Sequence, residues 1–321
     1  GGRGGGGGGG GRGGGGPPLD LTTSVGSVTL AAPVMTASGT AGHGDELAAY
    51  VDLSRLGAVV VKSLSADPWP GNPAPRVQPT PSGMINSVGL QGPGVAAWRE
   101  HELPAVLATG AAVVASIWGR HVDDFARAAE ALAGCDPRVV AVEVNLSCPT
   151  PDGGSPLFAH DPVATAEAVA ASAAAGLPRW AKLSPNTDRV VEVAAAAHAA
   201  GAEAVTLVNT LLGLVIDTTA RRPALGGGGG GVSGPAIHPV AVRTVYDVRA
   251  ALPDLPIVGV GGVVDGEGAV ELLLAGASAV QVGTATFADP RAVVTVLEGL
   301  ETWCGRHGVS RVADLIGGAH G

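Results

Sequence analysis

The chain has 321 residues, a formal net charge of −9 and three cysteines. The negative charge argues against nucleic acid as the main partner, and no apolar run reaches the length of a membrane-spanning helix. No two cysteines form a CxxC pair, so we do not expect a disulfide framework, a structural zinc site or an iron–sulfur cluster within this chain. No signal peptide is visible, which leaves a cytoplasmic enzyme without a metal site as the default expectation.

The chain divides into a short tail and one large domain. Residues 1–16 are only glycine and arginine, a composition that cannot bury a core. We therefore expect a disordered tail over residues 1–18. The remainder, residues 19–321, has the length of one barrel domain with insertions.

One pattern repeats along this domain: a helical stretch, a glycine, an apolar run and a polar cluster. A glycine just past a helix tolerates the left-handed conformation that ends it, and a short apolar run is typical of a buried parallel strand. The runs predict strands near residues 58–61, 112–117, 139–145, 180–183, 204–208, 256–260 and 279–282, and a first strand around Val28–Met35.

Strands that alternate with helices favour a parallel sheet, and this number of strands fits a TIM (β/α)8 barrel. A doubly wound open sheet is the alternative. Asp161-Pro162 and Asp289-Pro290 each look like an N-cap followed by a first-turn proline. Both folds place their chemistry at the carboxyl ends of the strands.

The most informative strand end is the segment from Val142 to Pro149. It places the amide of Asn145 and the thiol of Cys148 where a substrate would lie. Cys148 could be an inert buried thiol, but its flanks belong to a loop and favour a general base with thiolate character. Cys135 and Cys304 lie near helix ends and are interpreted as structural.

The last two strands end in small-residue turns, Gly261-Gly262 and Gly283-Thr284. Glycines expose main-chain N–H groups, and a following helix N-terminus adds partial positive charge. The corresponding loops of TIM barrels commonly hold a phosphate. Tight turns that merely pack are the alternative, but two such turns at consecutive strand ends favour a phosphate site.

Two lysines and three asparagines are further candidates for ligand contact. Lys62 and Lys182 each close an apolar strand, where a lysine must pair with something or keep its head in water. Two at equivalent strand ends favour contact with an anionic ligand or an electron-rich ring. Asn86, Asn145 and Asn209 suit a planar ligand with alternating carbonyl and N–H groups, although asparagine is also common in turns.

The ordered set of these motifs resembles class 1 dihydroorotate dehydrogenase, most closely its class 1B catalytic subunit. The resemblance runs from about residue 20 to the C-terminus. The motifs that carry it are Ala37–Gly39, Gly71–Arg76, Ile85–Gln91, Asn145–Pro149, Lys182–Asn186, Asn209–Gly213, Ser233–Ile237, Gly261-Gly262 and Gly283-Thr284. Cysteine at position 148 points to class 1, and the Gly71–Arg76 stretch with Leu90-Gln91 favours class 1B.

The resemblance implies a TIM barrel that holds FMN and oxidises dihydroorotate to orotate in de novo pyrimidine biosynthesis. Cys148 then matches the base that removes the C5 proton, while the C6 hydride passes to the flavin. The implied substrate ligands are Lys62, Asn86, Val88, Gly89, Leu90, Asn145, Asn209 and Thr210. The implied FMN ligands are Ala37, Ser38, Lys62, Ser63, Asn145, Lys182, Val208, Gly234, Gly261, Gly262, Gly283 and Thr284.

The same resemblance implies partners. Class 1B predicts a homodimer and an electron-transfer subunit that carries FAD and a [2Fe–2S] cluster and passes electrons to NAD⁺; fumarate would be the acceptor in class 1A. The open alternatives are a related flavin enzyme of the dihydropyrimidine dehydrogenase type, a flavin-binding barrel without turnover, and a non-redox barrel that binds a sugar phosphate.

Some features depart from the family or stand apart from its motifs. Thr150 occupies a place where the family usually has asparagine, which removes a substrate-facing amide. Asp152–Ser155 predicts a mobile lid, and the glycine run Gly226–Gly231 predicts a flexible segment that orders with flavin. His43, His160 and His238 are isolated, which favours capping or surface roles.

Overall fold

The structure is a computed structural model that describes residues 18–147 and 157–321. Eight parallel strands form one sheet in the order β3-β16-β15-β10-β9-β8-β7-β4. The end strands meet through the Gly57 N–H, which donates to the Val34 carbonyl at 2.9 Å, and the Val60 N–H, which donates to Thr36 Oγ1 at 2.8 Å. The strands are β3 (Val34–Thr36), β4 (Val59–Val60), β7 (Val113–Ile117), β8 (Val139–Asn145), β9 (Arg179–Lys182), β10 (Ala204–Leu207), β15 (Ile257–Val260) and β16 (Ala279–Val282).

This closed sheet confirms the predicted TIM barrel and rules out the open doubly wound sheet. Each of the later predicted strands is present within about two residues of its expected bounds. The prediction of a first strand around Val28–Met35 was wrong in one respect, because this segment contains residues of two separate strands. β2 (Val28–Leu30) pairs antiparallel with β1 (Thr23–Val25) outside the barrel, and only β3 belongs to the barrel.

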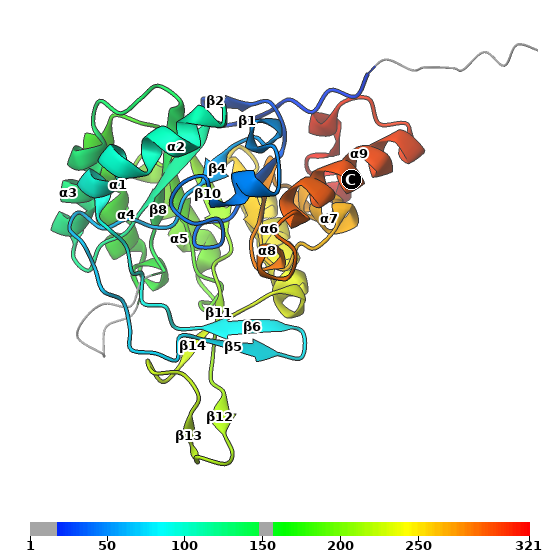
Figure 1. Cartoon of the computed structure of the whole chain (residues 1–321). Coiled ribbons are helices and arrows are strands. Elements are labelled where there is room, and N and C mark those ends of the chain that lie inside the picture. Colours follow the sequence, from blue (N-terminus) through cyan, green and yellow to red (C-terminus); the bar gives the residue numbers. More distant parts are fainter. Residues whose placement is uncertain (1–17, 148–156) are drawn as a thin grey trace, which may run out of the picture.

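Helices surround the barrel: α3, α4, α5 and α6 each pack on the next α-helix along the chain, and α7 packs on α9 (Figure 1). Asp161 caps α4 as predicted, since its carboxylate accepts from the Val163 N–H at 2.7 Å. The helix start predicted at Asp289-Pro290 was wrong, because α9 begins at Ala292 and Asp289 is the C-cap residue of α8. The helices are α1 (Val95–His101), α2 (Leu103–Ala108), α3 (Val122–Leu132), α4 (Pro162–Ala171), α5 (Val190–Ala199), α6 (His238–Ala251), α7 (Gly266–Ala275), α8 (Ala285–Ala288) and α9 (Ala292–His307).

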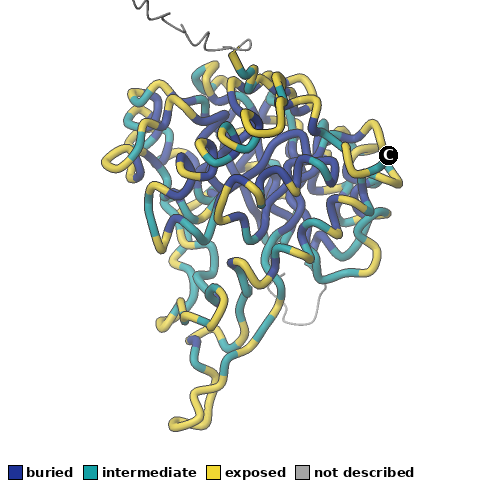
Figure 2. The backbone as a smooth tube through the Cα atoms, turned by 90° about the vertical axis from the view of Figure 1, so that its right-hand side faces the viewer, coloured by how far each residue is buried: buried dark blue, intermediate teal, exposed yellow. Residues whose placement is uncertain are grey.

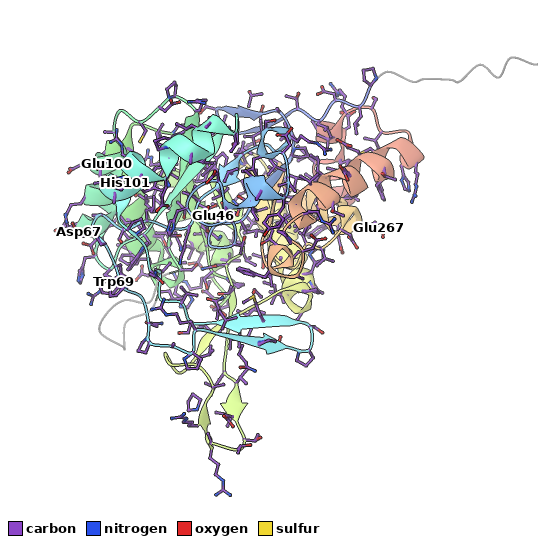
Figure 3. The ribbon with its side chains drawn as sticks, viewed as in Figure 1. Glu46, Asp67, Trp69, Glu100, His101 and Glu267 are labelled. Carbon is purple, nitrogen blue, oxygen red and sulfur yellow. The ribbon has the colours of Figure 1, made fainter. Side chains whose placement is uncertain are left out.

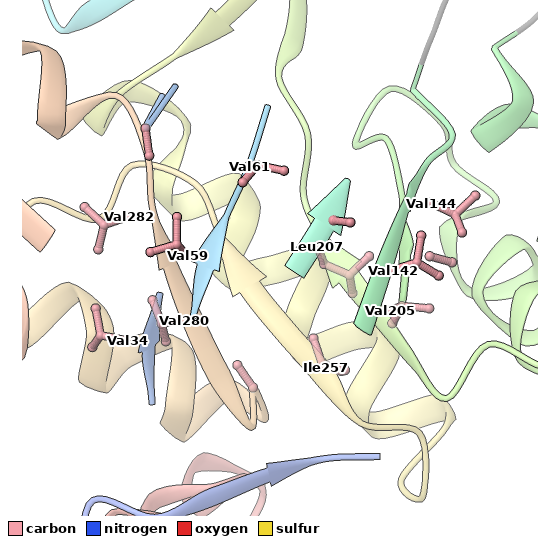
Figure 4. Close-up of a cluster of buried hydrophobic side chains, with 14 of the residues drawn as sticks. Val34, Val59, Val61, Val142, Val144, Val205, Leu207, Ile257, Val280 and Val282 are labelled. Carbon is pink, nitrogen blue, oxygen red and sulfur yellow. The ribbon is translucent and has the colours of Figure 1, made fainter. Parts of the chain in front are cut away.

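The core has two layers, because side chains along each strand point alternately to the helices and to the barrel axis. Valines of the strands, such as Val59, Val142 and Val280, pack with the helices in the outer layer (Figure 4). The buried backbone lies at the centre of the molecule, and exposed segments lie at its edge (Figure 2). Helix residues such as Glu100, His101 and Glu267 lie on the outer surface (Figure 3).

The inside of the barrel changes from apolar to polar along the strands. Its lower layer is an apolar cluster that includes Val114, Ala141, Trp180, Ala204 and Ala279. Two residues further along the same five strands, the side chains are polar and buried. This upper layer consists of Ser116, Glu143, Lys182, Thr206 and Gln281.

A second sheet crosses the carboxyl end of the barrel. It has the order β11-β14-β6-β5, and a hairpin of two further strands projects beyond it (Figure 1). The sequence predicted none of these strands. They are β5 (Val77–Thr80), β6 (Gly83–Asn86), β11 (Leu211–Gly213) and β14 (Gly230–Ser233) in the sheet, and β12 (Ile216–Asp217) and β13 (Arg222–Pro223) in the hairpin.

The glycine run Gly226–Gly231, which we predicted to be flexible and to order with flavin, makes several main-chain contacts in the structure. The Gly226 N–H donates to the Pro75 carbonyl at 2.8 Å, Gly230 pairs with β11, and Gly231 pairs with both β11 and β6. A Cβ atom on Gly230 would lie 2.4 Å from the Asn86 carbonyl oxygen, and one on Gly231 would lie 2.0 Å from Thr210 Oγ1. At Gly226, Gly227, Gly230 and Gly231 the neighbouring chain therefore leaves no space for a side chain, whereas a Cβ atom on Gly228 or Gly229 would meet no atom closer than 3.3 Å.

Across residues 18–147 and 157–321, no helix is both long and apolar enough to cross a membrane. The same residues contain no cluster of three or more histidine, cysteine, aspartate or glutamate side chains that could hold a metal ion.

Candidate active site

A cavity of about 870 Å³ lies at the carboxyl end of the barrel. Its walls come from the strand ends, the loops after β15 and β16, and the sheet formed by β6, β11 and β14. Every predicted ligand residue that the structure describes lines this one cavity: Ala37, Ser38, Lys62, Ser63, Asn86, Val88, Gly89, Leu90, Asn145, Lys182, Val208, Asn209, Thr210, Gly234, Gly261, Gly262, Gly283 and Thr284. Their individual roles remain predictions.

The predicted base Cys148 lies outside the described residues, as do Thr150 and the predicted lid at Asp152–Ser155. Asn145 and Ser147, which lie shortly before Cys148 in the sequence, both line the cavity. Ser147 Oγ is buried and has no hydrogen-bond partner within the described part of the chain.

Lys182 lies at the bottom of the cavity and is only 4% exposed. Its ammonium donates to Ser38 Oγ at 3.0 Å and lies 3.7 Å from Oε1 of the fully buried Glu143. A buried ammonium needs such a countercharge, because desolvation disfavours the charged form.

Lys62 enters the cavity from the end of β4 and is half-buried. Burial lowers the pKa of its ammonium, and the positive charge of Arg76 lowers this pKa further. Among the described residues that line the cavity, none is an aspartate or glutamate. Two lysines without a lining carboxylate suit an anionic ligand.

The side-chain amide of Asn145 is hydrogen-bonded to the Ser63 hydroxyl and to the main-chain N–H of Ser147. Its Nδ2 donates to Ser63 Oγ at 3.1 Å, and its Oδ1 accepts from the Ser147 N–H at 3.2 Å. Ser63 Oγ is also hydrogen-bonded to Ser116 Oγ at 2.8 Å. This arrangement fixes the orientation of the Asn145 amide at the cavity wall.

The loop from Ser87 to Leu90 is supported by the Gly71–Arg76 stretch. Asn72 Nδ2 donates to Ser87 Oγ at 2.9 Å, and the Asn72 N–H donates to the Val88 carbonyl at 3.0 Å. Arg76 in turn donates to the Asn72 carbonyl at 2.6 Å. Leu90 has a φ of +59°, a conformation that is uncommon for residues other than glycine and that often marks a binding site.

The glycine turns after the neighbouring strands β15 and β16 both line the cavity. Gly262 has a φ of +68°, and a Cβ there would lie 2.8 Å from the Gly234 carbonyl oxygen. Thr284 Oγ1 donates to Ser233 Oγ at 2.7 Å. These turns bring main chain from three segments together, as a phosphate site requires.

The helix N-termini contribute less to this site than we predicted. The carboxylate of Asp265 caps α7 and accepts from the Gly268 N–H at 2.9 Å, and α8 has only four residues. Any phosphate held here would rely mainly on the loop N–H groups.

The histidines occupy less superficial positions than we predicted. His160 lines the cavity with Nε2 3.3 Å from Ser184 Oγ, and burial lowers the pKa of its imidazole. His238 Nδ1 hydrogen-bonds the Gly261 carbonyl at 2.7 Å and so supports the first glycine turn. His43 is largely buried, and its Nδ1 lies 3.7 Å from Glu102 Oε2.

Sequence reasoning missed Glu143 altogether. It stands between two valines in β8 and was interpreted as part of an apolar run. Its Oε2 accepts from Gln281 Nε2 at 2.8 Å and from Thr206 Oγ1 at 3.2 Å. An acidic residue inside a predicted buried strand was the signal that could have identified it.

Comparison with known proteins gives one consistent result. The family model for dihydroorotate dehydrogenase matches residues 20–303. The catalytic subunit of dihydroorotate dehydrogenase B (NAD(+)) from Trichlorobacter lovleyi is 44% identical over 302 residues, which cover 94% of this chain and 99% of that protein. The protein of the same name from Desulforudis audaxviator is 46% identical over 298 residues, which cover 92% of this chain and 96% of that protein.

Proposed function

Because the chain belongs to the dihydroorotate dehydrogenase family, we propose that it oxidises dihydroorotate to orotate in pyrimidine biosynthesis, with FMN as its bound cofactor. The observation that carries this proposal is the cavity, which gathers two lysines, three asparagines and two glycine turns at the carboxyl end of one barrel. When bound, the flavin supplies a two-electron acceptor, and the protein supplies orientation and proton transfer.

The described residues fit a flavin mononucleotide. The cavity is large enough for a flavin and a small substrate together. At one end, the turns at Gly234, Gly261-Gly262 and Gly283-Thr284 have no side chains large enough to keep a phosphate from the main chain. At its floor, Lys182 offers a positive charge to the ring system.

One group of cavity residues would hold the flavin, and a second group would hold the substrate. The flavin ring system would be held by Ala37, Ser38, Ser63, Lys182 and Val208 and its phosphate by the glycine turns. Lys62 would bind the substrate carboxylate. The substrate ring would be oriented by Asn86, Asn145, Asn209, Thr210 and the main chain of Val88, Gly89 and Leu90.

Cys148 would remove the C5 proton of dihydroorotate as a general base. Asn145 and Ser147 support this role because both line the cavity and both lie within three residues of Cys148. Hydrogen bonds that fix Asn145 would hold the substrate ring at a set position relative to the thiolate.

The proposed setting includes partner proteins. The relatives carry the words "catalytic subunit" and "NAD(+)" in their names. By analogy, this chain would act in the cytoplasm as a homodimer bound to an electron-transfer subunit with FAD and a [2Fe–2S] cluster, with NAD⁺ as the final acceptor.

An anaerobic visible spectrum tests the proposal. The purified chain, reconstituted with FMN, should show a flavin spectrum that bleaches on addition of dihydroorotate and is unaffected by dihydrouracil. Bleaching by dihydrouracil alone would favour an enzyme of the dihydropyrimidine dehydrogenase type. A chain that stays colourless after reconstitution would contradict the flavin site and favour a barrel that binds a sugar phosphate.

A further inference from the structure

The polar layer inside the barrel contains an ion pair directly beneath the cavity. Glu143 and Lys182 lie on the neighbouring strands β8 and β9, with Glu143 fully buried and Lys182 only 4% exposed. TIM barrels usually fill this space with bulky branched side chains. Because removing two charges from water costs several kcal/mol per ion, a packed apolar layer would serve stability at least as well.

The carboxylate of Glu143 is anchored on one side only. Its Oε2 accepts from Gln281 Nε2 and Thr206 Oγ1, and both partners are fully buried. Its Oε1 faces the Lys182 ammonium at 3.7 Å and has no hydrogen bond within the described part of the chain. The anchored oxygen thus fixes where the negative charge sits relative to the lysine.

The ammonium of Lys182 lies between this carboxylate and the cavity. On the cavity side it donates to Ser38 Oγ at 3.0 Å, and Ser38 itself lines the cavity. A ligand in the cavity would therefore lie close to the positive charge of Lys182, with the negative charge of Glu143 behind it. At these separations, in a low-dielectric interior, each charge influences a ligand strongly.

We propose that Glu143 is a positioning residue that holds the Lys182 ammonium at the cavity floor and partly offsets its charge, and that it thereby sets the reduction potential of the bound flavin. This inference rests on the proposed function, because it requires a flavin at that floor. A positive charge beside a flavin ring favours its anionic reduced form. The carboxylate behind the lysine limits that preference.

The test is the midpoint potential of bound FMN in the Glu143→Gln variant at pH 6. Glutamine has nearly the same shape and can still accept from Gln281 and Thr206, but it carries no charge. We expect reduced FMN to gain at least about tenfold in affinity relative to oxidised FMN, which corresponds to a potential about 30 mV more positive for a two-electron couple.

Thr206→Val is the matched control. It removes one hydrogen bond to the same carboxylate in the same buried layer without changing any charge, and its potential should stay within a few millivolts of that of the unchanged protein. An unchanged or more negative potential in Glu143→Gln, or an equal shift in Thr206→Val, overturns the proposal.

If Glu143→Gln does not fold, Glu143→Asp replaces it. The shorter side chain keeps the charge but withdraws it from Lys182, so we expect a smaller shift in the same direction, and an unshifted potential contradicts the proposal. Failure of the proposed function has a different signature. In that case the unchanged protein binds no FMN, whereas failure of this inference leaves a normal flavin spectrum with an unshifted potential.

Discussion

Lys62 is a cavity lysine for which the described structure shows no carboxylate partner. Burial and the nearby charge of Arg76 lower its pKa, so the free protein stabilises its protonated form less than water would. A bound carboxylate would supply the missing countercharge and raise this pKa again. Ligand binding and protonation of Lys62 should therefore be coupled.

The first prediction concerns this coupling. Orotate should bind most tightly below the pKa of Lys62 in the free protein, and its affinity should fall by up to about tenfold per pH unit as the pH rises through that pKa. Orotate titrations of the flavin spectrum from neutral to alkaline pH measure the effect. Lys62→Gln should bind orotate weakly, with a flatter pH dependence; an equally steep dependence in this variant would assign the titration to another group.

The second prediction concerns Cys148. Replacement by alanine should lower turnover by about two to four orders of magnitude, because a general base typically contributes that much, while the FMN spectrum stays intact. At neutral pH, the turnover of Cys148→Ser should lie between that of Cys148→Ala and that of the unchanged protein. It should increase as the pH rises, because a hydroxyl is a weaker acid than a thiol. Near-normal turnover of the alanine variant would refute the assignment.

At the residue scale, the sequence revealed the polar residues at the ends of strands but not the contacts of polar residues in the middle of strands. Lys62, Asn145 and Lys182 could be recognised because a polar side chain ends an apolar run. Glu143 stands out as an acidic residue in an apolar run, but its contact with Gln281 could not be inferred, because the two residues lie 138 positions apart in the chain. Only the closed barrel brings them into contact.

At the scale of elements, β14 shows how closely the second sheet packs over the cavity. Its glycines lie against β6, β11 and the Thr210 side chain, which itself lines the cavity. The sheet therefore forms part of the cavity wall rather than a loose cover. Any side chain added to this strand must displace a neighbour.

The third prediction follows from this packing. In Gly231→Ala the new methyl group would overlap Thr210 Oγ1, so we expect the free energy of unfolding to fall by about 1–3 kcal/mol and the KM for dihydroorotate to rise. Urea unfolding and steady-state kinetics measure the two effects. Gly229→Ala is the control, because its methyl group would meet only the Gly213 carbonyl oxygen at 3.3 Å; an equal loss in both variants would argue against a specific contact with Thr210.

Most barrel elements were predictable because β4, β7, β9, β10 and β16 are short apolar runs that follow a glycine. The second sheet was not predictable, because half of β14 is glycine, both β6 and β14 are partly exposed, and neither shows the alternating apolar pattern of a strand. Their pairing depends on contacts between segments about 145 residues apart.

At the scale of the whole molecule, the repeating strand–helix pattern predicted a parallel sheet with the number of strands that fits a barrel. The pattern did not show how the first and last strands of that sheet meet. An open sheet and a barrel share the same local pattern. Closure depends on β3 and β4, the shortest of the barrel strands, and on the hydrogen bonds of Thr36 with Val60. These contacts could not be inferred from the spacing of apolar residues.

The fourth prediction concerns the route of electrons out of the molecule. The sequence shows three cysteines, too few for an iron–sulfur cluster of its own, and no second nucleotide-binding fingerprint. The isolated chain should therefore oxidise dihydroorotate with artificial dyes but reduce NAD⁺ poorly, and the partner subunit should confer NAD⁺ reduction. NADH formation with and without the partner measures this; rapid NAD⁺ reduction by the isolated chain would contradict it, and efficient use of fumarate would indicate class 1A.

The glycine run that begins at Gly226 also has a consequence for how this gene can vary. Here one extra glycine would shift β14 by one residue against both of its neighbours and turn every following side chain to the opposite face. Ser233 would then lose its hydrogen bond with Thr284, so natural variants should keep the length of this run.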